Sequence, residues 1–313
     1  MPKVLVTGGA GFIGSHIVDA LVAQGDRVTV LDNLSTGRTA NLAQVRDRIE
    51  LIEADLTDRE AVRRAVQGVD CIFHQAALAS VQRSVEKPLD THAACVTGTL
   101  ILIDEARQAK VRRIVYAASS SAYGDQPASS KRETDLPLPI SPYGAAKLAA
   151  EYYLSAFAAM KEIETVALRY FNVFGPRQDP HGEYSAVIPR FITAMLQGRA
   201  PTVYGDGHQS RDFTFIENVV AANLLAGKAA GVSGRVLNVA AGGKISLLEL
   251  IAALNKLLKM KVEPRHEQAR IGDVRESMAD ITLARQFLGY EPHVSFEEGL
   301  RRSIDYYVGL VRQ

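Results

Sequence analysis

A glycine-rich turn near the start of the chain constrains the fold more than any other feature. It follows a short apolar run, residues 3–7, and has glycines at positions 8, 11 and 14. In this spacing the first glycine makes a tight turn, the second lets backbone N–H groups approach a pyrophosphate, and the third lets the next helix pack close to the sheet. The residues predicted to bind a dinucleotide here are Gly8, Gly11, Phe12, Ile13 and Gly14.

A second predicted strand, residues 27–31, leads directly into Asp32, 18 residues after Gly14. A carboxylate at this place accepts hydrogen bonds from ribose hydroxyls and repels a 2′-phosphate, which predicts NAD rather than NADP as the cofactor. His74 ends another predicted strand and is interpreted as a structural residue. Further cofactor contacts are predicted at Asn33, Asp55, Leu56, Gln75, Ala76, Ala77 and Tyr170.

The first half of the chain alternates apolar runs with helical patterns. The predicted strands are 3–7, 27–31, 49–53, 71–74, 113–117 and 165–169, and the predicted helices are 11–24, 59–66, 90–109 and 142–160. Strands that are apolar throughout are typical of a sheet covered on both faces. The order predicts an α/β fold with a doubly wound parallel sheet of the Rossmann type, which binds ligands at the carboxyl ends of its strands.

The second half has a different pattern. An irregular loop at 175–182 precedes predicted helices 187–197, 217–230, 247–258 and 296–311 and predicted strands 202–204, 212–215 and 236–239. We expect a smaller, mixed C-terminal substrate lobe. The predicted division is residues 1–172, together with about 216–240, for the NAD-binding domain, and residues 173–313 for the lobe.

Composition excludes several classes. The hydrophobic share is 47% and the charged share 23%, and 36 Lys and Arg against 35 Asp and Glu leave a net charge of +1. These values exclude a disordered chain and leave no basic excess for nucleic acid. Two cysteines make no disulfide framework, no leader pattern or membrane-length apolar run is present, and the seven histidines lack metal-ligand spacing. We expect a cytoplasmic protein without a metal, a nucleic-acid partner or a membrane partner.

A second set of residues predicts catalysis. Tyr143 and Lys147 lie four positions apart near the start of a predicted helix, so they share one face. An ammonium near a phenol favours the phenolate, so we expect Lys147 to lower the pKa of Tyr143 and make it a general base. Ser119, Ser120 and Ser121 follow the fifth predicted strand and would lie at the same edge of the sheet, within reach of a reacting oxygen.

The chain resembles extended short-chain dehydrogenases, and among them nucleotide-sugar 4-epimerases. The resemblance extends over essentially the whole chain. It rests on the glycine turn, Asp32 with Asn33, Tyr143 with Lys147, and the segments 119–125, 169–176, 203–207, 211–213 and 272–274.

The resemblance implies a bound NAD that is recycled within the site. Tyr143 would take the proton from the sugar 4-hydroxyl, Ser119 would orient that hydroxyl with Ser120 or Ser121 assisting, and Lys147 would bind the nicotinamide ribose. The catalytic residues are thus Tyr143, Lys147, Ser119 and Ser120. The implied UDP-sugar contacts are Ser80, Ser119, Ser121, Asn172, Val187, Tyr204, Arg211, Arg270, Asp273 and Ser277.

The residues next to Ser120 bear on the preferred sugar. Related dehydratases and decarboxylases carry a carboxylate there, and this chain has Ser121 and Ala122. Ser277 falls where epimerases carry a gate residue, and a small residue leaves room for an N-acetyl group. We expect a UDP-GlcNAc/UDP-GalNAc 4-epimerase that also accepts UDP-glucose and UDP-galactose. A UDP-glucuronate 4-epimerase, another NAD-dependent nucleotide-sugar oxidoreductase and a non-enzymatic NAD sensor are the alternatives.

Two further expectations come from the resemblance. Relatives usually have Asn where this chain has Cys95, and a thiol is a poorer hydrogen-bonding group, which bears on how tightly the cofactor is held. Helices 90–109 and 142–160 resemble those that form a four-helix dimer interface, so a homodimer is expected. Leu100, Ile103 and Leu148 would supply that interface or, equally, the core.

Overall fold

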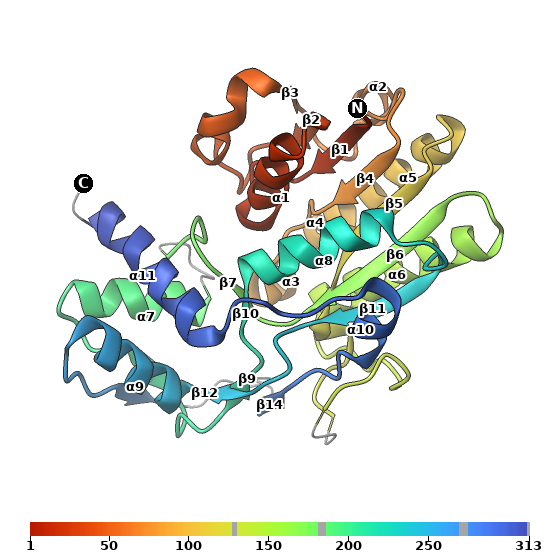
Figure 1. Ribbon diagram of the computed structural model, residues 1–313. Coiled ribbons are helices and arrows are strands. Elements are labelled where there is room, and N and C mark those ends of the chain that lie inside the picture. Colours follow the sequence, from red (N-terminus) through yellow and green to blue (C-terminus); the bar gives the residue numbers. More distant parts are fainter. Residues whose placement is uncertain (127–129, 181–185, 269–274, 312–313) are drawn as a thin grey trace.

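The protein is described here from a computed structural model, in which residues 1–126, 130–180, 186–268 and 275–311 are described (Figure 1). A seven-stranded sheet lies at its centre in the order β3-β2-β1-β4-β5-β6-β11, and every neighbouring pair is parallel. The strands are β1 (Lys3–Thr7), β2 (Arg27–Asp32), β3 (Ile49–Glu53), β4 (Cys71–His74), β5 (Arg113–Ser119), β6 (Glu164–Tyr170) and β11 (Arg235–Val239).

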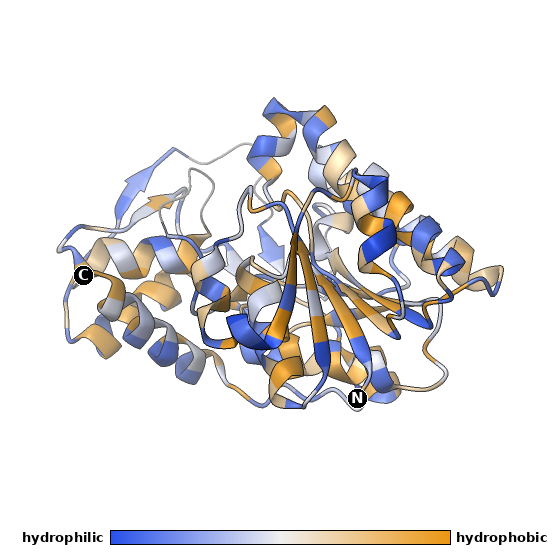
Figure 2. Cartoon of the chain, turned by 90° about the horizontal axis from the view of Figure 1, so that it is seen from above, coloured by the Kyte–Doolittle hydropathy of each residue, from blue (hydrophilic) through white to orange (hydrophobic). Residues whose placement is uncertain are grey.

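Helices cover both faces of this sheet. One face carries α1 (Phe12–Ala23), α8 (Ile216–Lys228) and α10 (Thr282–Leu288), and the other carries α2 (Arg59–Ala65), α5 (Gly98–Gln108) and α6 (Pro142–Ala159). The strands are therefore apolar along most of their length, as Figure 2 shows in orange. The prediction of a doubly wound parallel sheet is confirmed.

The strand order reverses at β1. From β1 the chain proceeds outward through β2 and β3, then returns to place β4 on the other side of β1. Helices α1 and α5 consequently lie on opposite faces of the sheet, and the loops after β1 and β4 diverge. In open α/β sheets this switch point forms the crevice in which ligands bind.

One predicted helix contains a π-helical turn. The segment predicted as a helix over 90–109 consists of α4 (Pro88–His92), a π-helical turn η2 (Ala93–Thr97) and α5. The predicted helix is confirmed, since the backbone is helical throughout; only its π turn was not predicted, because apolar spacing does not distinguish an α turn from a π turn. The short helices α3 (Val81–Glu86) and α10 and the 3₁₀ stretch η1 (Thr39–Arg48) were not predicted, and short elements carry little periodicity.

The smaller lobe has its own apolar core. Helices α7 (Val187–Leu196), α9 (Leu247–Leu258) and α11 (Phe296–Val311) pack around buried aromatic side chains, among them Phe174 and Phe213. Three small sheets complete the lobe: β7 (Val173–Phe174) with β10 (Thr214–Phe215), β8 (Thr202–Tyr204) with β13 (Arg265–Glu267), and β9 (Ser210–Arg211) between β12 (Ile245–Ser246) and β14 (Glu276–Ser277). Within the described ranges, none of the helices has the length and apolar character that a bilayer crossing requires.

The strand predicted at 212–215 is also corrected. Strand β10 covers only Thr214–Phe215, and Asp212 lies between β9 and β10 with its side chain fully buried. Its carboxylate accepts hydrogen bonds from backbone N–H groups of other segments. Its own backbone N–H donates to the carbonyl oxygen of Ser277 on β14, and pairing with β7 begins only at Thr214.

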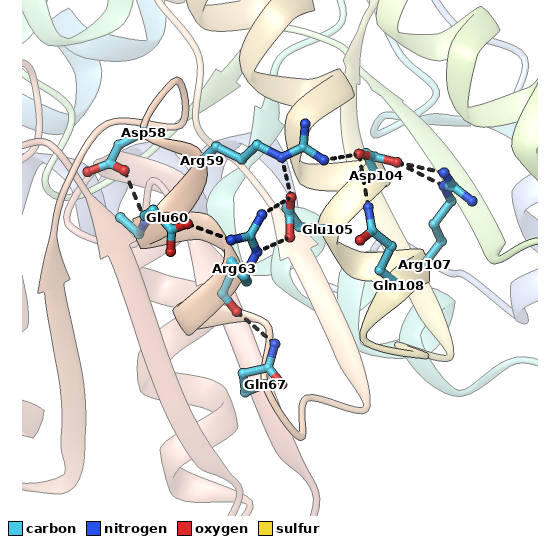
Figure 3. Close-up of polar contacts among 10 residues, drawn as sticks. Asp58, Arg59, Glu60, Arg63, Gln67, Asp104, Glu105, Arg107 and Gln108 are labelled. Carbon is cyan, nitrogen blue, oxygen red and sulfur yellow. Dashed lines mark hydrogen bonds and ion pairs between the residues drawn. The ribbon is translucent and has the colours of Figure 1, made fainter.

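A polar cluster joins α2 to α5 on one face of the sheet (Figure 3). Glu105 is buried, and both of its carboxylate oxygens accept hydrogen bonds from Arg59 and Arg63 of α2. Asp104 pairs with Arg59 and with Arg107 of its own helix. The arginines are about half exposed, so their heads stay hydrated while they satisfy a buried charge.

Candidate active site

The turn between β1 and α1 leaves no space for a side chain at two of its glycines. Gly8 has a φ of +67°, and a Cβ there would lie 2.7 Å from the backbone of Ala76. A Cβ on Gly14 would lie 2.1 Å from the carbonyl oxygen of Gly8. Both positions therefore require glycine, and the turn comes directly against the loop that follows β4.

The N-terminus of α1 faces this turn. Gly11 is its N-cap and supplies no side-chain hydrogen bond, so the first amides of the helix, at Phe12 and Ile13, are left for another acceptor. A cradle that a Cβ would fill, backed by the positive end of a helix, suits a diphosphate. The residues present here fit a dinucleotide.

Asp32 lies at the end of β2, and its side chain is almost fully buried. One carboxylate oxygen accepts a hydrogen bond from Ala10 N at 2.9 Å and the other from Leu34 N at 2.8 Å. The first bond attaches the strand end to the glycine turn. Each oxygen keeps a further lone pair, so the carboxylate can still accept from a hydroxyl.

Asn33 and Asp55 connect the ends of β2 and β3. Asn33 Nδ2 donates to Asp55 Oδ2 at 2.6 Å, and Thr57 donates to Asp55 Oδ1 through its backbone N–H and its hydroxyl. Burial alone would raise the pKa of Asp55, but these hydrogen bonds outweigh it and hold the pKa below its usual value. Leu56 next to it is buried.

His74 is a structural residue, as expected. Thr99 Oγ1 donates to the carbonyl oxygen of Cys95, so it accepts from His74 Nε2 at 2.8 Å, and His74 Nδ1 accepts from Thr7 Oγ1 at 2.7 Å. This arrangement needs the neutral ring. Burial, with the nearby charge of Lys147, lowers the pKa of His74 to about 3.

The residues after β4 point toward β6 and α8. Gln75 Oε1 accepts from the Tyr170 hydroxyl at 3.2 Å, and Asn223 of α8 hydrogen-bonds the same hydroxyl at 2.8 Å. Ala76 and Ala77 are small and half-buried, and they come after Gln75 alongside the glycine turn. The structure therefore brings the predicted cofactor residues of β4 and β6 together.

The predicted catalytic residues converge at the end of β5. Ser119 Oγ donates to Ser121 Oγ at 3.0 Å, and the Tyr143 phenol hydrogen-bonds Ser119. Helix α6 begins beside these serines, and Gly144 permits the close approach, since a Cβ there would come only 2.7 Å from the Ser121 carbonyl oxygen. Ser120 is half-buried at the start of the short turn η3 (Ser120–Ala122).

Lys147 lies one turn further along α6 and is buried. Its ammonium lies 4.5 Å from the ring centroid of Tyr116 on β5, a cation–π contact. Burial lowers the pKa of Lys147, while the nearby Cys95 opposes that shift. The side chain is thus held against β5, near the end of the strand that carries Ser119.

The prediction that Lys147 lowers the pKa of Tyr143 is wrong. Burial raises the pKa of Tyr143 above its ordinary value, Cys95 raises it further, and the hydrogen bond with Ser119 only partly offsets them. Lys147 is not among the groups that shift the pKa of Tyr143, and its ammonium lies over the Tyr116 ring. Positive charge placed near the phenol would lower this pKa.

Cys95 lies inside the π-helical turn η2 and is buried against Val96 and Ala146. Its thiol is close enough to Tyr143, Lys147 and Tyr116 to influence the pKa of all three. The Thr99 hydroxyl donates to the backbone carbonyl of Cys95 and not to its thiol. Cys95 therefore contributes to the surroundings of the catalytic side chains.

The lobe and its edge provide most of the predicted substrate contacts. Asn172, between β6 and β7, has a φ of +30°, an unusual conformation for a non-glycine residue. Arg211 on β9 is paired in register with Ser277 on β14. Val187 begins α7, Tyr204 ends β8, and Ser80 caps α3 by accepting from Arg83 N at 3.1 Å. Arg270 and Asp273 lie outside the described residues.

Some residues of the site were not predicted. Ser84 of α3 accepts a hydrogen bond from Tyr143 N at 3.0 Å and is fully buried. Arg169 of β6 and Glu151 of α6 form a buried ion pair, with nitrogen–oxygen distances of 2.6 and 3.0 Å, that fixes α6 to the sheet. The only sequence signal for this pair is that both are charged residues within buried apolar runs.

The fold and the site define an NAD-dependent enzyme. The model of the NAD dependent epimerase/dehydratase family matches residues 4–240, and the chain belongs to this family. Its cofactor is NAD.

Within the family the chain is most usefully compared with three proteins. It is 40% identical over 310 residues to a UDP-glucose 4-epimerase of Mycolicibacterium smegmatis, covering 97% of this chain and 98% of the relative. The structure of a UDP-N-acetylglucosamine 4-epimerase from Methanobrevibacter ruminantium, bound to UDP-N-acetylmuramic acid, has a TM-score of 0.94 and 38% identity over 99% of both chains. That of a UDP-glucuronic acid 4-epimerase from Bacillus cereus, bound to UDP-glucuronic acid and NAD, has a TM-score of 0.91 and 30% identity over 98% of this chain and 99% of that one.

Proposed function

We propose that the protein inverts the configuration at C4 of a UDP-sugar, with UDP-GlcNAc and UDP-GalNAc as preferred substrates and UDP-glucose and UDP-galactose as further ones. The observation that carries this proposal is the convergence of Ser119, Tyr143 and Lys147 beside a glycine cradle for a dinucleotide. Relatives that are UDP-sugar 4-epimerases match the chain over nearly its whole length.

The NAD would be held along the switch point of the sheet. The amides at the start of α1 would bind its diphosphate, Asp32 would accept from a ribose hydroxyl, and Asn33, Asp55 and Leu56 would border the adenine. Gln75, Ala76, Ala77 and Tyr170 would line the middle of the cofactor, and Lys147 the nicotinamide ribose. When bound, the cofactor would supply reversible hydride transfer at C4 of the sugar.

Tyr143 would serve as the base. Its phenol would take the proton of the sugar 4-hydroxyl, while Ser119, hydrogen-bonded to both Tyr143 and Ser121, would orient that hydroxyl. Because burial raises the pKa of Tyr143, the site disfavours the phenolate until positive charge is added near it. We infer that Tyr143 becomes a base only when the cofactor is bound. The phenol would then lose its proton only in a site that is ready for the reaction.

The nucleotide end of the substrate would lie in the lobe. Arg211 would neutralise the diphosphate, with Asn172 contacting a phosphate oxygen and Val187 and Tyr204 bordering the uridine. Arg270 and Asp273 would complete this half of the site. Strong binding at the nucleotide would leave the sugar free to rotate in the pocket between the two hydride transfers, as the chemistry requires.

The N-acetyl preference rests on small residues at the sugar end. Ser277 and Ser80 leave room that a bulkier residue would fill, and Ser277 is adjacent to Arg211 across the β9–β14 pair. Extra room permits a larger substituent but weakly discriminates against a smaller one, so UDP-glucose should also react. UDP-glucuronate remains the second candidate, because a relative acting on it matches the chain at 30% identity.

Purified protein, incubated without added NAD, tests this proposal. UDP-GlcNAc, UDP-glucose and UDP-glucuronate are supplied separately, and the sugar nucleotides are separated by chromatography. We expect UDP-GalNAc to form, and the Ser277→Tyr variant to lose UDP-GlcNAc turnover while keeping that of UDP-glucose. Much faster turnover of UDP-glucose by the unmodified protein would refute the N-acetyl preference, and reaction of UDP-glucuronate alone would establish the second candidate.

Cofactor exchange separates the epimerase from the remaining alternatives. An epimerase regenerates its NAD in each cycle, so added labelled NAD should not enter the protein faster in the presence of UDP-sugar. Release of NADH during turnover would instead identify an oxidoreductase. A protein that binds NAD but converts none of the sugars would fit a sensor.

We further propose that the protein is a homodimer. Exposed apolar side chains gather on α3, α4, α6 and the segment leading into α6, elements that pack against one another. They are Val81, Val85, Leu89, Leu136, Leu138, Ile140, Tyr152 and Tyr153. Ile103 and Leu148, two of the residues expected to form either the interface or the core, are buried in the core.

A further inference from the structure

Asp212 is a buried carboxylate with an unusual set of partners. It is fully buried between β9 and β10. Its Oδ1 accepts from Ala241 N at 3.0 Å, and its Oδ2 accepts from Gly242 N at 3.1 Å and from Ala279 N at 3.3 Å. Its own backbone N–H donates to the carbonyl oxygen of Ser277 at 2.7 Å.

These bonds gather three segments that are far apart in the sequence. Ala241 and Gly242 come after β11, the edge strand of the NAD-binding sheet. Ser277 ends β14, and Ala279 lies two residues beyond it and forms a bridge with Lys131. Asp212 therefore ties the small sheet β12-β9-β14 to the end of the central sheet.

Burying this carboxylate costs free energy of desolvation. Among the residues that the structure describes, no lysine or arginine pairs with it, and its charge is compensated by backbone N–H groups alone. Burial outweighs these hydrogen bonds and raises the pKa of Asp212 to about 6. Because the surroundings disfavour the ionised form, the carboxylate is weak evidence for a stabilising role. We therefore look for its role in the segments that it holds together.

Arg211, the residue proposed to contact the substrate diphosphate, directly precedes Asp212 in the chain. Its guanidinium donates through Nη1 to the carbonyl oxygen of Ser210 at 2.9 Å and to that of Arg275 at 3.5 Å. Arg275 precedes β14, and its carbonyl also accepts from Ser210 N at 3.0 Å. The direction of the Arg211 side chain therefore depends on β14 staying paired with β9.

We propose that Asp212 is a positioning residue of the substrate site, which holds β14 against β9 and so directs Arg211 toward the substrate diphosphate. The inference rests on the proposed role of Arg211. Without the carboxylate, Ala279 N and the Ala241–Gly242 amides lose their acceptor, β14 is released, and the carbonyl of Arg275 no longer fixes the guanidinium. Arg211 then reaches the phosphate oxygens in fewer of its rotamers, and affinity at the nucleotide end falls.

The affinity for UDP measures this effect without any chemistry at the sugar. Calorimetry on the NAD-containing protein compares the unmodified chain with Asp212→Asn, Arg211→Ala and the double variant. Asparagine keeps the size of the side chain but places N–H donors against backbone donors. Asp305→Asn, an exposed carboxylate of α11 in the same lobe, is the matched control.

We expect Asp212→Asn to weaken UDP binding about tenfold, the loss of one charge-assisted contact. The double variant should bind no more weakly than Arg211→Ala, because both substitutions remove the same interaction. In the epimerase assay, KM should rise while kcat changes by less than about threefold. Additive losses in the double variant would mean a general loosening of the lobe, and unchanged affinity in Asp212→Asn would overturn the inference directly.

Failure of the proposed function gives a different result. If UDP does not bind, or if Arg211→Ala binds it as well as the unmodified protein does, the substrate site is wrong and the inference falls with it. Should Asp212→Asn fail to fold, hydrogen exchange on the unmodified protein still decides. The amides of Ala241, Gly242 and Ala279 must be protected without UDP. Rapid exchange of these amides would show that their hydrogen bonds to Asp212 are not formed before UDP binds.

Discussion

At position 143 a phenol lies beside Ser119 on one side and Cys95 on the other, with its pKa raised by burial. Replacing it with phenylalanine removes only the hydroxyl. We expect Tyr143→Phe to lower kcat by about 10²–10⁴-fold, the usual contribution of a general base. NAD content and UDP affinity should stay unchanged, because the ring still fills its place. Tyr152→Phe, an exposed position on the same helix, is the control. Full activity in Tyr143→Phe would exclude Tyr143 as the base.

His74 makes stability depend on pH. Its pKa is about 3 in the folded protein against 6.5 for the free side chain, so below pH 6.5 the unfolded chain binds a proton that the folded one refuses. The free energy of unfolding should therefore fall by about 1.4 kcal/mol per pH unit below pH 6.5 from this residue alone. Urea denaturation between pH 7.5 and 5 measures the slope. The His74→Gln variant should lose that part of the slope, and equal slopes in both proteins would show that folded His74 is protonated.

Some residues of the site could be predicted from the sequence, and others could not. The glycine turn, Ser119, Tyr143 and Lys147 could be predicted because their chemistry requires fixed spacings along the chain. Ser84 could not, since it contacts Tyr143 N across 59 residues and serines are common in helices. The burial of Asp212 could not be predicted either, since the backbone groups that it binds lie 29 to 67 residues away.

At the scale of elements, the packing of α2 against α5 depends on the buried carboxylate of Glu105. Glu105 is buried and accepts hydrogen bonds from Arg63 and Arg59, which hold its pKa below the usual range. Glu105→Gln should cost about 2 kcal/mol, since both arginines lose a charged acceptor. Glu60→Gln, at an exposed position of the same cluster, should change stability by less than about 0.5 kcal/mol. Chemical denaturation of both variants checks this, and equal losses would mean that burial of Glu105 does not matter.

The central strands could be predicted to within two residues at either end. Both faces of the sheet are covered, so most of these strands are short apolar runs with a clear boundary. The small strands of the lobe could not be predicted in the same way. Strands β9, β12 and β14 have two residues each, too few for any periodicity, and their pairing is set by contacts such as those of Asp212.

For the whole molecule, the proposed dimer can be tested through its exposed apolar side chains. Val85 and Leu89 are 64% and 82% exposed. The double substitution Val85→Glu with Leu89→Glu should halve the mass measured by light scattering, because four carboxylates cannot be buried at a two-fold interface. Its melting temperature at low protein concentration should match that of the unmodified protein. Leu310→Glu on α11 is the control, and a variant that remains dimeric would exclude this face.

The position of β11 has a consequence for how the protein is made. This strand, Arg235–Val239, completes the sheet beside β6, although the chain between them builds much of the lobe. On the ribosome, some three quarters of the polypeptide must emerge before β6 gains its last neighbour. Until then β6 is an open edge with apolar faces, a state that invites aggregation. A gene fragment that stops at residue 172 would make this transient state permanent, so we expect it to require chaperones or to accumulate as insoluble protein.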